Sequence, residues 1–297
     1  MKLAAIIVVL LAVVICAGAQ SSAPAGKNLN QAQQGAAAAP PQGKRPPQAK
    51  TQAEFEAYKA AVANQADPAA LEKATDEFAA KFPNSELTAL LYRATMRGYQ
   101  SANNGDKLAE VAAKVLKVDP DDPEALVNTA EVIAEHTHDS DLDKDQRYDE
   151  ARKDAERGIQ TVETDIPAGV GPEQVEAYKG LLRSNAYSVL GTIAFNQEKY
   201  ADAESAFRKS VDAFPQPDPV VVLRLALSLD KQNRYPEALK EASRAVDLTQ
   251  ENTAAGKLAR QERDRLLQLT GGAKPSAPAS PSASPASTPA PANPQPH

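Results

Sequence analysis

The chain has 297 residues, which at about 150 residues per domain predicts one or two domains. Hydrophobic residues make up 42% of it, but aromatic residues only 5%, and tryptophan is absent, which disfavours β-sandwiches and β-barrels. The formal net charge of -6 argues against nucleic acid as a partner, since nucleic-acid-binding proteins carry basic surfaces. Three histidines and one cysteine leave little material for a zinc site or a nucleophilic catalytic set. The composition therefore disfavours an enzyme, and we expect no cofactor.

The first residues have the pattern of a secretory signal. Lys2 provides a positive end, residues 3–15 are apolar, and Ala17-Gly18-Ala19 is the small-x-small sequence that signal peptidases cleave. We expect cleavage after Ala19 and a periplasmic or secreted protein. Two alternatives stay open: an uncleaved anchor, since about 17 apolar residues can just span a bilayer, and lipidation at Cys16, which Ile15 disfavours.

Two segments are too poor in large apolar residues to form a core. Residues 20–50 are mostly Ala, Gln, Pro and Gly, and residues 271–297 contain eight prolines among Ala and Ser. Such compositions are typical of disordered linkers. The folded part is therefore expected within residues 51–270.

That folded part contains an internal repeat. The clearest unit has two apolar helical runs, a tight turn and a closing proline, carried by Tyr187, Leu190, Gly191, Ala194, Tyr200, Ala203, Phe207, Ser210 and Pro215. About 35 residues later, equivalent positions hold Val222, Leu225, Ala226, Leu229, Tyr235, Ala238, Ala242 and Ala245. The sequence resembles the tetratricopeptide repeat family. Gly191 with Ala203, and Ala226 with Ala238, are the small residues expected to meet where the helices of one pair cross.

The resemblance implies an all-α solenoid of about five helix pairs and a capping helix. The same frame, less regular upstream, places the repeats near residues 52–85, 89–122, 123–165, 184–217 and 219–252, with a cap helix over 253–270. Pro172 to Asn196 contains no strong breaker, which predicts one extended helix of roughly 25 residues. The Pro- and Gly-rich residues 167–172 before it form either a rigid kink or a hinge.

The turn of the third repeat is overlong and acidic. Its carboxylates follow the spacing of a calcium-binding loop and are Asp139, Asp141, Asp143, Asp145 and Glu150. Lys144, however, stands where such a loop needs glycine. The simpler interpretation is that these acids cap and offset the dipole of a helix that begins near Asp145.

In the tetratricopeptide repeat family, ligands bind in a concave groove lined by the first helix of each repeat. The equivalent residues here are Arg93, Arg97, Glu131, Glu135, Asn185, Ser188, Thr192, Asn196, Leu223, Leu227 and Lys231, with Phe195 beside them. Alternatively, Arg93 and Arg97 pair with Glu131 and Glu135 as surface ion pairs.

These observations lead to a functional hypothesis. We expect a non-catalytic scaffold of the cell envelope that binds a peptide or protein segment in the groove. Membrane contact would come only through an uncleaved signal anchor. The alternatives are a calcium-responsive envelope protein that uses residues 139–150, and an accessory subunit of an envelope enzyme.

Overall fold

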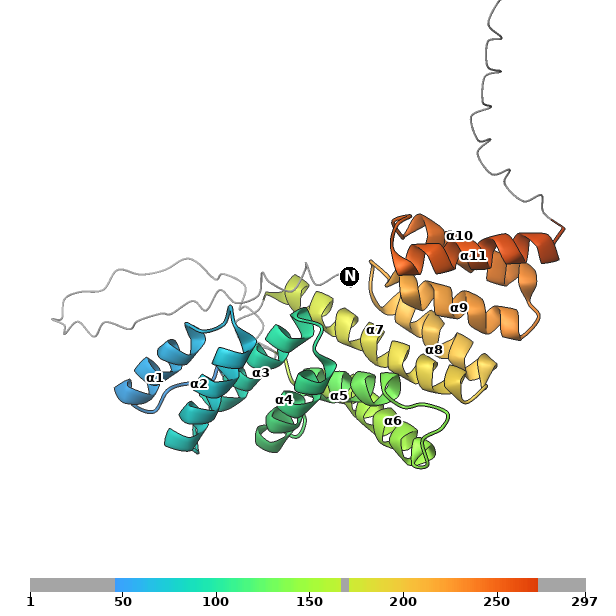
Figure 1. The fold of residues 1–297 in the computed structure, drawn as a ribbon. Coiled ribbons are helices and arrows are strands. Elements are labelled where there is room, and N and C mark those ends of the chain that lie inside the picture. The colour runs from blue at the N-terminus through green and yellow to red at the C-terminus, as the bar shows by residue number, and fades with distance from the viewer. Residues whose placement is uncertain (1–45, 167–170, 272–297) are drawn as a thin grey trace, which may run out of the picture.

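The computed structural model describes residues 46–166 and 171–271, and within these ranges the chain forms eleven α-helices and no strand (Figure 1). The helices are α1 (Gln52–Val62), α2 (Pro68–Lys81), α3 (Leu87–Ser101), α4 (Gly105–Val118), α5 (Pro123–Glu135), α6 (Lys144–Thr161), α7 (Pro172–Asn196), α8 (Tyr200–Ala213), α9 (Pro219–Lys231), α10 (Tyr235–Asp247) and α11 (Ala254–Leu269). The all-α prediction is confirmed, and so is the single long helix, since α7 has 25 residues.

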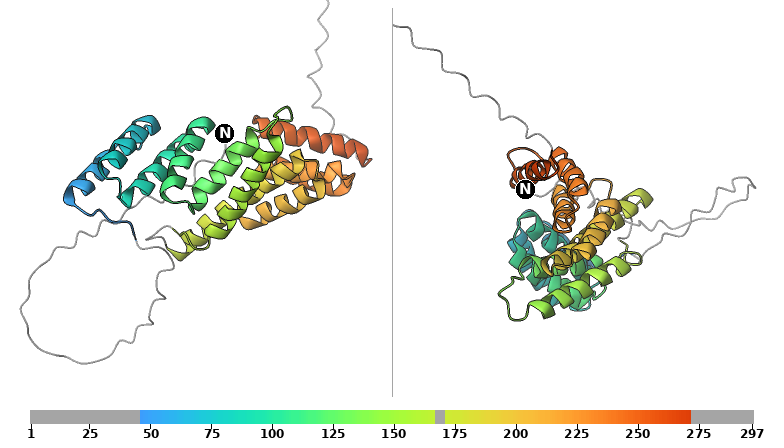
Figure 2. Two further views of the ribbon diagram at one scale, coloured as in Figure 1. Left: turned by 90° about the horizontal axis from the view of Figure 1, so that it is seen from below. Right: turned by 90° about the vertical axis from the view of Figure 1, so that its right-hand side faces the viewer.

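The helices pair in chain order into a solenoid. Figure 1 and the left view of Figure 2 show α1 and α11 at opposite ends of a curved array, with the long α7 running obliquely through its middle. The pairs α1–α2, α3–α4, α5–α6, α7–α8 and α9–α10 are the five expected, and α11 packs on α10 as the terminal helix. This arrangement makes α1, α3, α5, α7 and α9 the first helices of the repeats.

Short polar residues and prolines set the helix starts. Side-chain oxygens of six residues accept hydrogen bonds from backbone N–H groups in the first turn of the following helix, namely Thr51, Asp67, Asn104, Asp122, Asp218 and Thr253. Pro68, Pro123, Pro172 and Pro219 occupy the first helical position, where no N–H donor is needed.

Three of the turns within repeats share a backbone conformation. Asn103, Glu198 and Asn233 have φ angles of 53°, 60° and 61°, in the left-handed region, and each lies between the two helices of its repeat. Such angles are uncommon for residues other than glycine, and asparagine tolerates them best. The same turn therefore recurs in the second, fourth and fifth repeats.

Four clusters of buried apolar side chains lie along the array. One joins α1 to α3 around Phe78, the next joins α3 to α5 around Met96, and a third joins α5 to α7 around Tyr148. The fourth, around Phe207, joins α8 to α11. Each cluster thus involves only neighbouring helices, as expected for a solenoid.

Gly191 lies against an aromatic ring. A Cβ atom added to Gly191 would meet first the ring of Phe207, one helical turn beyond Ala203. The missing side chain of the glycine therefore leaves room for this ring. Ala226 and Ala238 are both fully buried in the C-terminal cluster.

Several expectations fall outside the described ranges: the signal sequence, most of the first linker, residues 167–170 of the joint before α7, and the tail after residue 271. Among the helices that the structure does describe, none combines the length and the apolar character needed to cross a bilayer.

Candidate functional site

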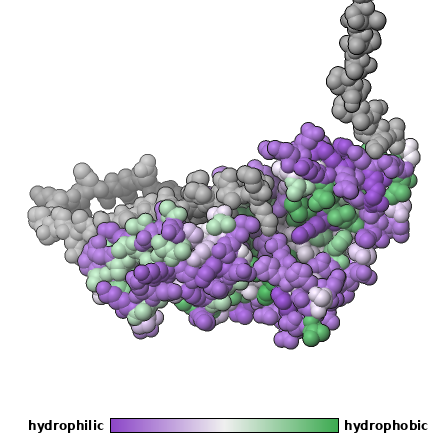
Figure 3. Space-filling view, viewed as in Figure 1, coloured by the Kyte–Doolittle hydropathy of each residue, from purple (hydrophilic) through white to green (hydrophobic). Residues whose placement is uncertain are grey.

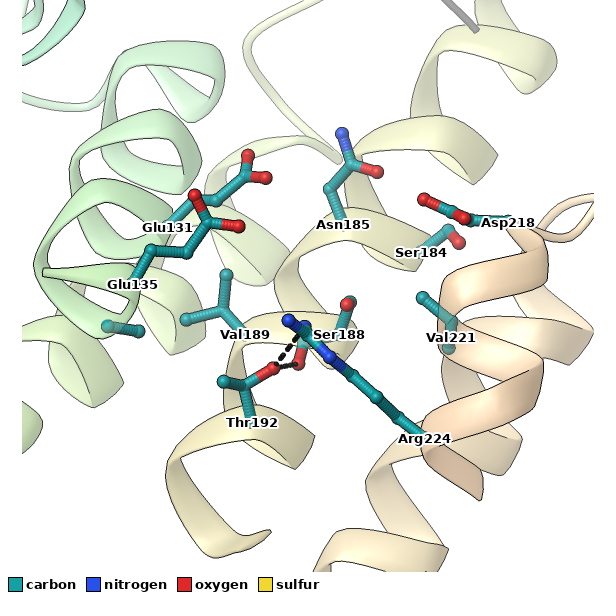
Figure 4. Close-up of a pocket in the computed structure, with 11 residues that line it drawn as sticks. Glu131, Glu135, Ser184, Asn185, Ser188, Val189, Thr192, Asp218, Val221 and Arg224 are labelled. Carbon is teal, nitrogen blue, oxygen red and sulfur yellow. Dashed lines mark hydrogen bonds between the residues drawn. The ribbon is translucent and has the colours of Figure 1, made fainter. Parts of the chain in front are cut away.

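A pocket lies between the first helices of three successive repeats (Figure 4). Its lining comes from α5, α7, α9 and the residue that caps α9, and consists of Glu131, Ala134, Glu135, Ser184, Asn185, Ser188, Val189, Thr192, Asp218, Val221 and Arg224. Its volume is about 50 Å³, well below the roughly 300 Å³ at which small-molecule sites begin. The space suits the end of one side chain.

Two polar contacts fix the floor of the pocket. Arg224 reaches from α9 to α7 and donates from Nη1 to Thr192 Oγ1 at 2.8 Å, while that hydroxyl donates to the Ser188 carbonyl at 2.9 Å (Figure 4). Ser184 is committed to the core, because its hydroxyl and that of Ser210 each donate to the other residue's carbonyl, at 2.9 and 2.7 Å. Arg224 therefore links the fourth and fifth repeats across the pocket.

The walls are mainly acidic. In Figure 4, Glu131 and Glu135 extend from α5 toward the open space, and Asp218 faces it from the start of α9. Asp218 also caps α9, because its Oδ1 accepts the Val220 N–H at 2.8 Å. With three carboxylates and one guanidinium, the lining has a formal charge of -2. Figure 3 shows the surrounding surface as mostly hydrophilic, with an apolar patch over the α9 region.

Five of the groove residues predicted from the sequence line this pocket: Glu131, Glu135, Asn185, Ser188 and Thr192. Sequence reasoning missed Asp218 and Arg224. A signal for both was present, since Arg224 is the only charged residue in the otherwise apolar stretch 219–229, and Asp218 precedes a proline at a helix start.

Asn196 and Phe195 lie outside the pocket. Asn196 donates to the hydroxyl of Tyr148 on α6 at 3.1 Å. Phe195 packs against the C-terminal cluster and meets the ring of Tyr200 edge-on, with centroids 5.4 Å apart. Both side chains therefore make contacts within the fold.

The three predicted groove residues of α9 also lie outside the pocket. Leu223 is buried and Leu227 packs against the C-terminal cluster, while Lys231 is exposed at the end of the helix. None of the three lines the pocket.

Arg93 and Arg97 form ion pairs within the protein. Arg93 pairs with Asp119, Asp122 and Asp165, and Arg97 forms a two-pronged pair with Glu124 at 2.7 and 2.6 Å. The sequence had suggested Glu131 and Glu135 as partners of these arginines. The arginines pair instead with carboxylates near the N-terminus of α5, among them Asp122 and Glu124. The Glu124 carboxylate raises the pKa of Arg97.

The Arg93 cluster ties three parts of the chain together. Asp122 caps α5, Asp165 follows α6, and Arg93 lies on α3. Burial raises the pKa of Asp122 to about 6, although the charge of Arg93 opposes this shift. Burial likewise raises the pKa of Tyr178, on the N-terminal half of α7, and the carboxylates of Glu124 and Asp122 add to the shift. The first half of α7 thus lies over this cluster.

A helix follows the acidic turn, as the simpler interpretation expects, but its N-cap residue Asp143 makes no side-chain hydrogen bond to the first turn, so the expected capping is not found there. Helix α6 begins at Lys144, so the expected start near Asp145 is confirmed. Asp139 pairs with Lys144 at 3.3 Å, and Asp141 accepts the His138 N–H at 2.9 Å and pairs with Arg147 at 3.4 Å. In the described part of the chain, the carboxylates that converge in a group of three are Asp119, Asp122 and Asp165, not those of residues 139–150. Arg93 already pairs with all three.

A family model agrees with this geometry. The tetratricopeptide repeat model matches residues 188–256, from the second half of α7 to the start of α11. Residues 188–256 are therefore tetratricopeptide repeats. The match covers α8, α9 and α10 completely, and the three earlier helix pairs continue the same solenoid.

One solved structure, that of PilF, shares the fold, and two others are less similar. PilF of Pseudomonas aeruginosa is 19% identical, with a TM-score of 0.51 over 74% of this chain and 87% of that one. PilW, described as a widely conserved type IV pilus biogenesis factor, is 15% identical, with a TM-score of 0.49 over 75% of this chain and 88% of its own. MamA is 14% identical, with a TM-score of 0.41 over 59% and 84%. No curated protein sequence matches the chain. Identities this low bear on the fold alone.

Proposed function

We propose that this tetratricopeptide-repeat protein is an exported, non-catalytic scaffold that binds a segment of another protein along the first helices of its repeats. The observation that carries the proposal is the pocket itself, whose lining comes only from α5, α7, α9 and the cap of α9. The second helices and the terminal helix contribute nothing to it. A partner that lay along this face would contact three repeats at once.

The same face argues for a chain segment as the occupant. A volume of about 50 Å³ suits one side chain, and the neighbouring helix faces supply contacts for the residues before and after it. Asn185 and Ser188 offer hydrogen-bonding groups at the centre of this surface, which an extended backbone can use.

Site-specific photo-crosslinking in the producing cell tests this function. A photoreactive phenylalanine analogue at Ser188 is expected to form a discrete adduct, whereas the same analogue at exposed Glu150 on α6, outside the pocket, serves as the matched control. Equal adducts at both positions, or none at Ser188, would contradict binding at this face.

Export is tested separately. N-terminal sequencing of the protein from the cell envelope fraction is expected to start at Gln20. A chain that starts at Met1 would support the uncleaved anchor. A soluble cytoplasmic chain would contradict export and leave the binding proposal untouched.

A further inference from the structure

An apolar patch lies on the exposed face of the last repeat, beside two cations. The patch consists of Val220, Leu223 and Leu227 of α9 and Leu258 of α11. Resting on the proposed function, we infer that the patch binds the partner segment as an amphipathic helix, with apolar side chains on the patch and carboxylates facing Arg224 and Lys231.

The apolar side chains of the patch gather in one place. Leu223 is buried, whereas Val220 and Leu227 are partly exposed. Leu258 is 56% exposed. Figure 3 shows apolar surface over the α9 region, bordered by hydrophilic residues. An apolar patch rimmed by polar residues is typical of a protein-binding surface, although singly exposed leucines are normal.

An ion pair aligns α9 with α11. Arg265 pairs with Asp230 at 2.5 Å, near the C-terminal end of each helix. Because α10 reverses the chain between them, α9 and α11 run in the same direction (Figure 1). Leu223 and Leu258 each precede this ion pair by about two helical turns, so they lie at the same level. The apolar patch therefore continues from one helix to the next.

Two cations follow the side of the patch that lies toward α7. Arg224 donates to the uncharged hydroxyl of Thr192, and Lys231 is exposed two turns later on the same helix face. Within residues 46–166 and 171–271, neither cation forms an ion pair. Asp218, at the start of α9, lies about 18 Å from Lys231 along the helix, beyond the screening length of about 8 Å at physiological salt. The exposed charge beside the patch therefore favours carboxylates.

A helix is the form of occupant that matches both rows. The apolar pair Val220 and Leu227 and the cationic pair Arg224 and Lys231 each repeat after two helical turns. A partner helix that presents apolar residues at i, i+4 and i+7 spans the same length, and its neighbouring face can carry carboxylates two turns apart.

The sequence argues against this chain as its own occupant. Residues 1–45 and 272–297 contain no aspartate or glutamate, so neither segment can supply the carboxylates. A second copy placed patch to patch by two-fold symmetry would bring cations of the same sign together. The occupant is therefore a segment of a different protein.

Designed helical peptides test the chemistry. Rhodamine-labelled peptides with leucines at i, i+4 and i+7, and with either glutamates or lysines on the neighbouring face, are titrated against the purified chain by anisotropy. We expect the glutamate peptide to bind about tenfold more tightly than the lysine peptide, which corresponds to about 1.4 kcal/mol. Higher salt should reduce this difference. A glutamate peptide with glutamines in place of the leucines should not bind.

Matched variants assign the binding to the patch. Leu258→Gln should weaken the glutamate peptide about tenfold while the Tm stays unchanged, because this side chain is 56% exposed. Lys231→Glu should reverse the charge preference, so that the lysine peptide binds more tightly. The controls are Leu142→Gln, at a fully exposed leucine in the acidic turn, and Lys153→Glu, exposed on α6. Neither control should change binding.

Crosslinking in the producing cell separates this inference from the proposed function. A photoreactive phenylalanine analogue at Leu258 is expected to capture the same protein as the analogue at Ser188. Capture at Ser188 alone would overturn the inference and leave the proposed function standing, whereas no capture at Ser188 contradicts the proposed function itself. Adducts that join Leu258 to this chain or to a second copy would overturn the inference. Equal affinity for the two charged peptides, or no binding of either, would overturn it as well.

Discussion

Gly191 lies so close to the ring of Phe207 that a Cβ atom on Gly191 would fall 2.5 Å from two of the ring carbons. The ring is fully buried in the C-terminal cluster. We expect Gly191→Ala to lower the free energy of unfolding measured with denaturant. Overpacking typically costs about 1–3 kcal/mol, and this exceeds the gain of up to about 1 kcal/mol from replacing glycine in a helix.

Two comparisons isolate this contact. Ala177→Gly, at an exposed position of the same helix, measures helix propensity alone. Phe207→Leu in the Gly191→Ala background should recover part of the loss, so that the two substitutions are not additive. Stabilisation by Gly191→Ala would show that the ring does not constrain this position.

The ion pair between Arg97 and Glu124 is expected to be energetically important. The Glu124 side chain is 8% exposed, so Arg97→Met would leave a buried carboxylate without its partner. Losing one partner of a buried pair costs about 3–5 kcal/mol. Arg157→Met is the matched control, because Arg157 and Asp121 are exposed and such pairs contribute about 0–1 kcal/mol. Thermal and denaturant unfolding should therefore show a larger loss of stability for Arg97→Met than for Arg157→Met. Adding Glu124→Gln to Arg97→Met should restore part of that loss. Equal losses would contradict the argument.

The sequence predicted the helices well because their determinants are local. Prolines and short polar residues mark the starts, and the apolar period of one unit recurs in the next, so α7 to α10 follow from the pattern alone. Asn185, Ser188 and Thr192 share one helix face by their spacing, and they meet at the pocket.

The remaining contacts depend on which helices lie side by side. Asp165 pairs with Arg93 across 72 positions of sequence, which no local spacing reveals. Asn196 has the spacing of a groove residue, yet its side-chain amide donates a hydrogen bond to the hydroxyl of Tyr148 on α6. The role of Arg224 likewise requires α9 to lie beside α7, where Thr192 accepts its hydrogen bond.

Asp122 makes the stability depend on pH in a definite direction. Its pKa in the folded protein is about 6, above its ordinary value of 3.8, because of burial. Its contribution to stability is therefore fully present below about pH 3.8 and is lost as the pH rises through about 6. Asp122→Asn cannot titrate, and asparagine also caps helices.

We therefore expect the Tm of Asp122→Asn minus the Tm of the unmodified protein to rise between about pH 4 and about pH 7. Asp119, Asp165 and Glu124 are present in both proteins, so the comparison isolates the substitution at Asp122. Thermal melts followed by circular dichroism at the two pH values measure it. A difference that is constant, or that falls with rising pH, would contradict the raised pKa.

The acidic turn is predicted not to bind calcium tightly. Asp139 and Asp141 already pair with Lys144 and Arg147, and a tight site would require its carboxylates to converge on the ion. Titration calorimetry of the purified chain with Ca²⁺ should show no micromolar binding. Micromolar binding that disappears in both Asp141→Ala and Glu150→Ala would revive the calcium-responsive alternative.

The last prediction concerns how far damage spreads along the solenoid. Ala203 is fully buried in the cluster that joins α8 to α11, so Ala203→Leu must force neighbouring side chains apart. The cost is expected to be about 1–3 kcal/mol. Because the cluster around Phe78 involves only α1 to α3, amide hydrogen exchange should speed up in α7 to α10 and remain unchanged in α1 to α4. Binding through the pocket should weaken together with this local loss, since α7 and α9 form its walls. Faster exchange throughout all eleven helices would instead show that the described chain unfolds as one cooperative unit.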